Sequence, residues 1–208
     1  MTKKVYVDHA ATTPVADEVV SAMEPYFTEH YGNASSLHYA GQKAARSINE
    51  ARENIAELIG ADNEREIIFT SGGTEANNLA IKGTAIALED KGNHIITSKV
   101  EHHAVLETCE YLEEHRDFNV TYLPVNENGM VDPGDVEEAI TADTVLITIM
   151  MANNEIGTIQ PVKKIGEIAS KNNVTFHTDA VQAVGHIPVD VNELNVDLLS
   201  MSAHKFNG

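Results

Sequence analysis

Cysteine is scarce in this sequence, and long apolar runs are missing from it. Cys109 is the only cysteine among the 208 residues, which excludes an internal disulfide framework and agrees with a reducing compartment. No apolar stretch approaches the length of a membrane span, and no signal-peptide core follows Lys3 and Lys4. We therefore expect a cytoplasmic protein that does not associate with a membrane.

Basic residues are also few. The sequence has 14 of them against 32 acidic residues, which gives a formal net charge of −18. Such a surface repels nucleic-acid backbones and anionic membranes, so direct binding to nucleic acid is not expected. The simplest role of this charge is solubility. Hydrophobic residues make up 42% of the chain, enough for one large domain with a proper core.

Strand-like and helix-like segments alternate along most of the chain. The short apolar or β-branched runs are residues 66–70, 94–98, 119–125, 144–151, 174–179 and 198–204. The helical candidates between them are residues 74–90, 103–115, 133–140 and 162–172. Apolar strands separated by helices predict an α/β fold with a mainly parallel sheet flanked by helices.

The N-terminal part of the sequence has a different organisation. Small and polar residues fill 7–15 and 31–41, which predicts loops, whereas apolar residues at helical spacing predict a helix over 42–60 that Gly60 ends. We divide the chain into N-terminal loops and helices, 1–60, and a large domain, 61–208. The chain stops directly after a strand and a lysine, whereas domain boundaries favour exposed linkers. We therefore expect it to be the N-terminal part of a longer protein.

Ligands of open α/β sheets bind beyond the carboxyl ends of the strands, and here those ends carry polar residues. A Gly72–Gly73 turn precedes a helix that Thr74 starts, an arrangement that binds phosphate but is also common as a plain tight connection. His102 and His103 follow the run 94–98. They lack partners at metal-ligand spacing, so a metal site is not expected.

The later strands end in a second group of polar residues. Asn154 follows the run 144–151, where the alternative is an ordinary polar turn. Asp179 ends an apolar run and must be paired there. Lys205 follows the last run, either as a surface side chain or as a desolvated, nucleophilic amine. One cofactor accounts for the set, pyridoxal 5′-phosphate, which needs a lysine, a carboxylate for its ring nitrogen and donors for its phosphate.

Seven segments together identify the family that the chain resembles. They are VYVDHAATTP, YGNASSLH, FTSGGTEANNLAI, VEHHAVLE, NNEIGTIQP, HTDAVQAVGHIPVDV and DLLSMSAHKFNG. The sequence resembles the cysteine desulfurases of the NifS/IscS type, within the class V branch of the fold-type I pyridoxal-phosphate enzymes. The resemblance implies a homodimer that converts L-cysteine to L-alanine and passes sulfur to iron–sulfur scaffold or tRNA-thiolation proteins.

The resemblance also assigns roles to the strand-end residues. It implies that Lys205 is the Schiff-base lysine, that Asp179 pairs with the ring nitrogen, and that His102 stacks on the ring and moves protons. The residues that match phosphate contacts are Gly73, Thr74, Ser202 and His204. The residues that match positions near the phenolic oxygen of the ring are Asn154 and Gln182. His103 is expected to be a helix-start residue without a role in the site.

The sequence departs from the family in length. Members of the family are nearly twice as long, and the missing part carries their nucleophilic cysteine and the arginine that binds the substrate carboxylate. Cys109 lies on a predicted helix and is expected to be a small buried residue rather than that nucleophile. Residues 1–208 alone are therefore expected to lack desulfurase activity. The alternatives are another class V activity, such as selenocysteine lyase or aminotransferase, and a shortened, non-catalytic binding module.

Overall fold

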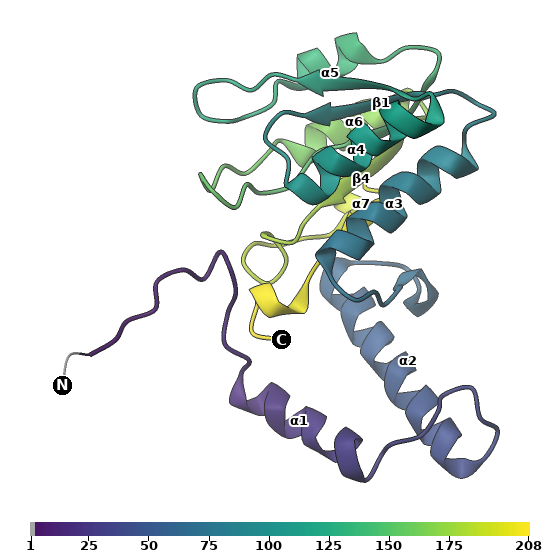
Figure 1. The fold of residues 1–208 in the computed structure, drawn as a ribbon, viewed down its shortest axis with the longest axis vertical. Coiled ribbons are helices and arrows are strands. Elements are labelled where there is room, and N and C mark those ends of the chain that lie inside the picture. The colour runs from purple at the N-terminus through teal and green to yellow at the C-terminus, as the bar shows by residue number, and fades with distance from the viewer. Residues whose placement is uncertain (1–2) are drawn as a thin grey trace. The chain divides into compact units, whose positions relative to one another are not determined.

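A computed structural model describes residues 3–208 (Figure 1). These residues form two compact units. Unit 1 comprises the residues up to Phe69 together with Ala203–Gly208, and unit 2 comprises Thr70–Ser202. The domain division predicted at residue 60 stays a prediction. None of the helices in residues 3–208 is long and apolar enough to cross a membrane.

Unit 2 is built on a five-stranded sheet in which every neighbouring pair of strands is parallel. The strands are β1 (His94–Ser98), β2 (Asn119–Leu123), β3 (Thr144–Thr148), β4 (Thr175–Asp179) and β5 (Leu198–Ser200), in the spatial order β2-β1-β3-β4-β5. The predicted α/β class with a parallel sheet is confirmed. The order reverses between β1 and β3, which is where open sheets of this kind bind their ligands.

Two groups of helices flank the sheet (Figure 1). The helices of unit 2 are α3 (Gly73–Ala87), α4 (His103–Arg116), α5 (Pro133–Ala139), α6 (Val162–Lys171) and α7 (Val191–Leu194). Helix α3 packs against α4, and α6 packs against α5 and α7. The core between α3, α4 and the sheet includes Ile81, Ile95, Val105 and Leu146, all fully buried. Apolar side chains buried at helical spacing on α3 and α4 explain why these segments pack onto the strands.

Unit 1 holds the remaining helices. They are α1 (Asp17–Thr28), α2 (Tyr39–Ile59) and the short 3₁₀ turns η1 (Glu64–Glu66) and η2 (Ala203–Lys205). Helix α2 confirms the predicted helix, and Gly60 ends it with a φ of 71°, a left-handed conformation that glycine adopts without strain. Helix α1 was not predicted. It contains Pro25, and none of its residues is buried, although Val20, Met23 and Phe27 lie at helical spacing.

Two of the predicted strands are corrected by the structure. Residues 66–70 form no strand, and the side chains of Ile68 and Phe69 are 68% and 51% exposed. The backbone of Ile67 is satisfied without a sheet, because Arg52 Nε donates to its carbonyl at 3.1 Å and its N–H donates to Glu64 at 3.2 Å. The last run is a strand only over Leu198–Ser200, and η2 replaces its predicted end.

Candidate active site

Seven of the predicted residues belong to unit 2. His102, Asn154, Asp179, Gln182 and Ser202 end or follow the strands β1, β3, β4 and β5. Gly73 and Thr74 belong to the first turn of α3, where Gly73 lies next to Val181 and Ser202. Hydrogen bonds hold the strand ends together, with the Met151 N–H donating to the carbonyl of Asp179 and the Ala180 N–H to that of Ser200, both at 2.8 Å. The edge is therefore an ordered surface made from several separate segments of the chain.

Asp179 lies at the end of β4 and is only 5% exposed. Its carboxylate accepts hydrogen bonds from the side-chain amide of Asn77, at 2.7 Å, and from the Val181 N–H, at 3.0 Å. These donors offset the cost of burying a carboxylate. Asn77 is itself buried, and its Oδ1 has no hydrogen-bond partner among the described residues. Sequence reasoning missed Asn77, because its burial and its bond to Asp179 depend on how α3 packs against β4.

The first turn of α3 approaches the same edge. Gly72 precedes the helix and provides no side-chain cap for its N–H groups. A Cβ added to Gly73 would lie 3.0 Å from Val181 Cγ2 and 3.7 Å from Ser202 Cβ, so glycine permits a close approach to the segments after β4 and β5. Thr74 follows with an exposed side chain. A helix N-terminus with adjacent hydroxyl groups is suited to a phosphate.

His102 is the N-cap of α4. Its Nδ1 accepts a hydrogen bond from the Ala104 N–H at 3.0 Å, so the neutral imidazole carries its proton on Nε2. His103 starts the helix, as expected, and its side chain is exposed. Within residues 3–208, no group of three or more histidine, cysteine, aspartate or glutamate side chains could hold a metal ion.

Glu101, next to His102, is a second residue that sequence reasoning missed. Its side chain is buried and accepts hydrogen bonds from Ser98 Oγ, at 2.6 Å, and from the Met150 N–H, at 2.9 and 3.0 Å. Burial raises the pKa of Glu101 to about 8, and these hydrogen bonds partly oppose the rise. The carboxyl group joins the turn after β1 to the end of β3, across the point where the strand order reverses.

The two asparagines after β3 differ in their surroundings. Asn153 is buried, donates to the carbonyl of Val100 at 2.9 Å and accepts from the N–H groups of Glu155 and Ile156. It therefore shapes the turn. Asn154 is half-buried and donates to Glu155 Oε1 at 2.8 Å, so its side chain lies at the surface of the edge.

His204 and Lys205, the other two predicted residues, lie in unit 1, two and three residues after Ser202 in the sequence. Both are on η2. Lys205 Nζ donates to the carbonyl groups of Ala10, at 2.6 Å, and Ala11, at 3.0 Å. His204 Nδ1 lies 3.0 Å from Thr12 Oγ1.

Cys109 lies in the core of unit 2 and is fully buried. Burial, and to a lesser extent the nearby carboxylates with Glu101 first among them, raises the pKa of its thiol to about 12. A buried thiol with such a pKa is not a nucleophile at neutral pH. The expectation that Cys109 is a small buried residue is confirmed.

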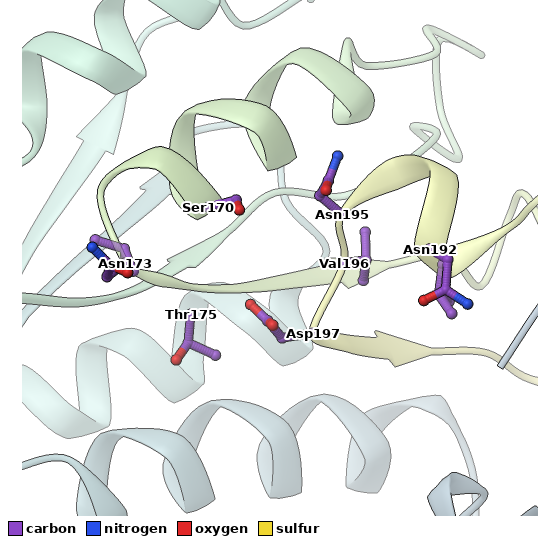
Figure 2. Close-up of a pocket in the computed structure, with 9 residues that line it drawn as sticks. Ser170, Asn173, Thr175, Asn192, Asn195, Val196 and Asp197 are labelled. Atoms are coloured by element: carbon purple, nitrogen blue, oxygen red, sulfur yellow. The ribbon is translucent and has the colours of Figure 1, made fainter. Parts of the chain in front are cut away.

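A hollow of about 470 Å³ lies elsewhere in unit 2 (Figure 2). Its lining comes from the end of α6, the start of β4, α7 and the residues before β5, and includes Asn173, Thr175 and Asn195. Asp197, also in the lining, accepts a hydrogen bond from the Phe176 N–H at 2.8 Å, which joins the starts of β4 and β5. The hollow is therefore at the amino ends of these strands, and none of the predicted site residues lines it.

The fold and the polar edge define a class of protein, the fold-type I enzymes with a parallel sheet. Comparison with known proteins identifies the family within this class, because the family described as Aminotransferase class-V matches residues 5–208. The chain belongs to this family.

Curated relatives named cysteine desulfurase IscS cover the whole chain. The protein from Dictyoglomus turgidum is 60% identical over 208 residues, and the one from Methanosarcina thermophila is 60% identical over 206 residues. These matches cover 100% and 99% of this chain but 52% and 50% of the relatives. The chain thus spans about half the length of the curated relatives it matches.

Solved structures agree with this assignment. A NifS-like protein superposes with a TM-score of 0.95 at 43% identity, covering 99% of this chain and 56% of that protein. A structure described as SspA in complex with cysteine gives a TM-score of 0.94 at 45% identity, covering 98% of this chain and 58% of that protein.

Enzymes of this family depend on pyridoxal 5′-phosphate, and the residues of unit 2 are suited to that cofactor. The uncapped first turn of α3, with the hydroxyl groups of Thr74 and Ser202, provides donors for a phosphate. Asp179 is a buried carboxylate for a ring nitrogen. The missing Cβ of Gly73 lets the helix N-terminus lie close to Val181 and Ser202.

Proposed function

We propose that the protein is a pyridoxal-phosphate-dependent cysteine desulfurase, which takes sulfur from L-cysteine and leaves L-alanine. The observation that supports the proposal is the buried carboxylate of Asp179, hydrogen-bonded to the helix whose first turn has no side-chain cap, in a chain 60% identical to a protein named cysteine desulfurase IscS. When bound, the cofactor withdraws electrons from the Cα of an amino-acid substrate.

Each of the predicted site residues has a defined role in this proposal. Gly73, Thr74, Ser202 and His204 hold the phosphate, and Asn154 and Gln182 hold the phenolic oxygen of the ring. Asp179 keeps a proton on the ring nitrogen, because a carboxylate beside that nitrogen stabilises its charged form. His102 stacks on the ring and exchanges protons at Nε2, the nitrogen that its N-cap bond leaves protonated. Lys205 binds the cofactor covalently.

The thiol that receives the sulfur is not in residues 1–208, because their one cysteine is buried in the core. We propose that the thiol comes from outside this stretch and that the sulfur passes to an iron–sulfur scaffold or tRNA-thiolation protein. Residues 1–208 alone are then expected to release no sulfide from L-cysteine with a reductant present. Turnover above the Lys205→Ala background would make Cys109 the nucleophile after all.

The decisive experiment maps the lysine that binds the cofactor. The purified intact protein is incubated with pyridoxal 5′-phosphate, reduced with borohydride, digested and examined by mass spectrometry. We expect the label on Lys205, no label in Lys205→Ala, and normal labelling in Lys171→Ala, which removes an exposed lysine paired with Glu137 at 3.0 Å. A label on another lysine would overturn the assignment.

The same preparation separates the alternative functions. Labelling with sulfide release from L-cysteine supports the desulfurase. Labelling with amino-group transfer, or with strong preference for selenocysteine, indicates another class V activity. Absence of labelling indicates a non-catalytic binding module.

We also propose a homodimer. Large apolar side chains of unit 1 are exposed, with Leu37 and Tyr39 at 91% and 85%, and a second copy of the chain would cover such surface. Light scattering on the intact protein is expected to give twice the mass of one chain, and an active monomer would contradict this proposal.

A further inference from the structure

Two segments of unit 1 that lie far apart in the sequence are joined by a dense set of hydrogen bonds, here called the clasp. The segments are residues 10–16 and residues 204–207, and they lie side by side in Figure 1, in purple and yellow. The backbone bonds of the clasp run from the Thr13 N–H to the His204 carbonyl, at 2.9 Å, and from the Ala16 N–H to the Asn207 carbonyl, at 3.0 Å. Asn207 Nδ2 adds a bond to the carbonyl of Pro14 at 2.9 Å.

Lys205 lies inside the clasp. Its amine donates to two consecutive carbonyl groups, those of Ala10 and Ala11, so two of its hydrogens are directed by backbone atoms. A lysine side chain has four rotatable bonds and loses much conformational freedom when its end is fixed. Two backbone acceptors therefore hold the amine in place before any cofactor arrives.

Thr13 is the residue that ties both sides of the lysine turn to the first segment. Its hydroxyl donates to the carbonyl of His204 at 3.0 Å and accepts from the N–H of Asn207 at 2.7 Å. These two partners stand immediately before Lys205 and two residues after it. A single hydroxyl group thus spans the turn that carries the amine.

We propose that residues 10–13 form a positioning element for Lys205, with the Thr13 hydroxyl as its main side-chain contribution. This inference rests on the proposed function, since it gives the amine a cofactor to react with. The element fixes the amine in advance, so the covalent attachment of the cofactor requires less reorganisation. Thr13 is a positioning residue and touches neither cofactor nor substrate in this proposal.

The test measures how fast pyridoxal 5′-phosphate attaches to Lys205 in cofactor-free intact protein. Samples are quenched with borohydride over time, and the label on Lys205 is quantified by mass spectrometry relative to a lysine-free peptide of the same protein. Thr13→Val keeps the shape of the side chain and removes both hydrogen bonds. We expect attachment to Lys205 to be about tenfold slower in Thr13→Val than in the wild type.

Three further variants control the interpretation. Thr13→Ser retains the hydroxyl and is expected to load at the normal rate. Thr141→Val removes a matched exposed threonine hydroxyl, which accepts from the Asp143 N–H at 3.3 Å before β3, and should have no effect. Asn207→Gly removes the bond to Pro14 while tolerating the φ of 69° at this position, and should slow attachment about fivefold.

Hydrogen exchange provides a second measurement that needs no cofactor. The residue 207 amide should be protected in the wild type and in Thr13→Ser and exposed in Thr13→Val. Wild-type loading rates in Thr13→Val and Asn207→Gly would overturn the inference. If Thr13→Val does not fold, the loading rate of Asn207→Gly is the test on its own. If the wild-type protein never acquires the label on Lys205, the proposed function is refuted instead. Hydrogen exchange at residue 207 then still shows whether Thr13 stabilises the clasp.

Discussion

The side-chain amide of Asn77 donates a 2.7 Å hydrogen bond to the carboxylate of Asp179. Asn77 belongs to α3 and Asp179 to β4, so the bond ties the helix whose first turn contains Gly73 and Thr74 to the strand that ends at the candidate site. The groups assigned to the phosphate and to the ring nitrogen are therefore fixed relative to each other. A buried side-chain bond of this kind also specifies where the helix lies along the sheet.

Replacing Asp179 by asparagine tests the ring partner. Asp179→Asn keeps the shape and removes the charge, so we expect bound cofactor with a turnover about 10²–10³-fold lower. Sulfide release and cofactor absorbance are the measurements. Asp197→Asn changes another carboxylate that accepts a backbone N–H and should leave turnover unchanged. Normal turnover in Asp179→Asn would remove this residue from the mechanism.

Glu101 predicts a loss of stability as the pH rises. Its pKa is about 8 in the folded protein, against an ordinary glutamate value of 4.5. Between these two pH values the folded state therefore keeps a proton that the unfolded chain releases. The free energy of unfolding should therefore fall as the pH increases from about 4.5 through 8. Thermal midpoints across this range should fall less steeply in Glu101→Gln than in the wild type. Glu107→Gln, an exposed change on α4, should follow the wild type, and parallel curves for all three would refute the prediction.

His177 predicts the opposite dependence at low pH. It is fully buried in β4, within 2.8 Å of Thr148 Oγ1 and 3.0 Å of Ser200 Oγ, and burial lowers its pKa from 6.5 to about 3. The unfolded chain therefore binds a proton that the folded protein does not, and stability should fall as the pH decreases from about 6.5 towards 3.

The variant His177→Phe removes this titration. It also leaves two buried hydroxyl groups unpaired, so we expect about 1–3 kcal/mol less stability at neutral pH and a shallower fall in acid. Urea unfolding at several pH values measures both. His115→Phe, at an exposed position, should keep the wild-type acid dependence. The prediction fails if the acid dependence of His177→Phe equals that of the wild type.

The thiol of Cys109 should not react with alkylating reagents in the folded protein. Because its thiol is buried and its pKa is about 12, iodoacetamide at neutral pH should label it only after denaturation. Cys109→Ala should cost about 1–2 kcal/mol of stability through the lost packing and leave sulfide release intact. Loss of activity in a folded Cys109→Ala protein would contradict the core assignment.

The sequence predicted the sheet well where strands are buried on both faces, as in β1 and β3, because their runs have consecutive apolar residues at the centre and no acidic or lysine side chain. The run 66–70 also has consecutive apolar residues and is not a strand, since local sequence does not show whether a neighbouring strand exists. The strand-end residues could be predicted because parallel strands end at a common edge. Glu101, Asn77 and the clasp could not, because each depends on a contact between residues distant in the sequence.

The clasp has a consequence for folding during translation. Thr13 and His204 are separated by 191 residues, so the first segment leaves the ribosome long before its partner is synthesised. At usual elongation speeds the delay is ~10–40 s, far longer than local helices need to form. During this delay residues 10–16 lack their hydrogen-bond partners and are accessible to chaperones and proteases. The turn that carries Lys205 cannot form these hydrogen bonds until residues 204–207 have been synthesised.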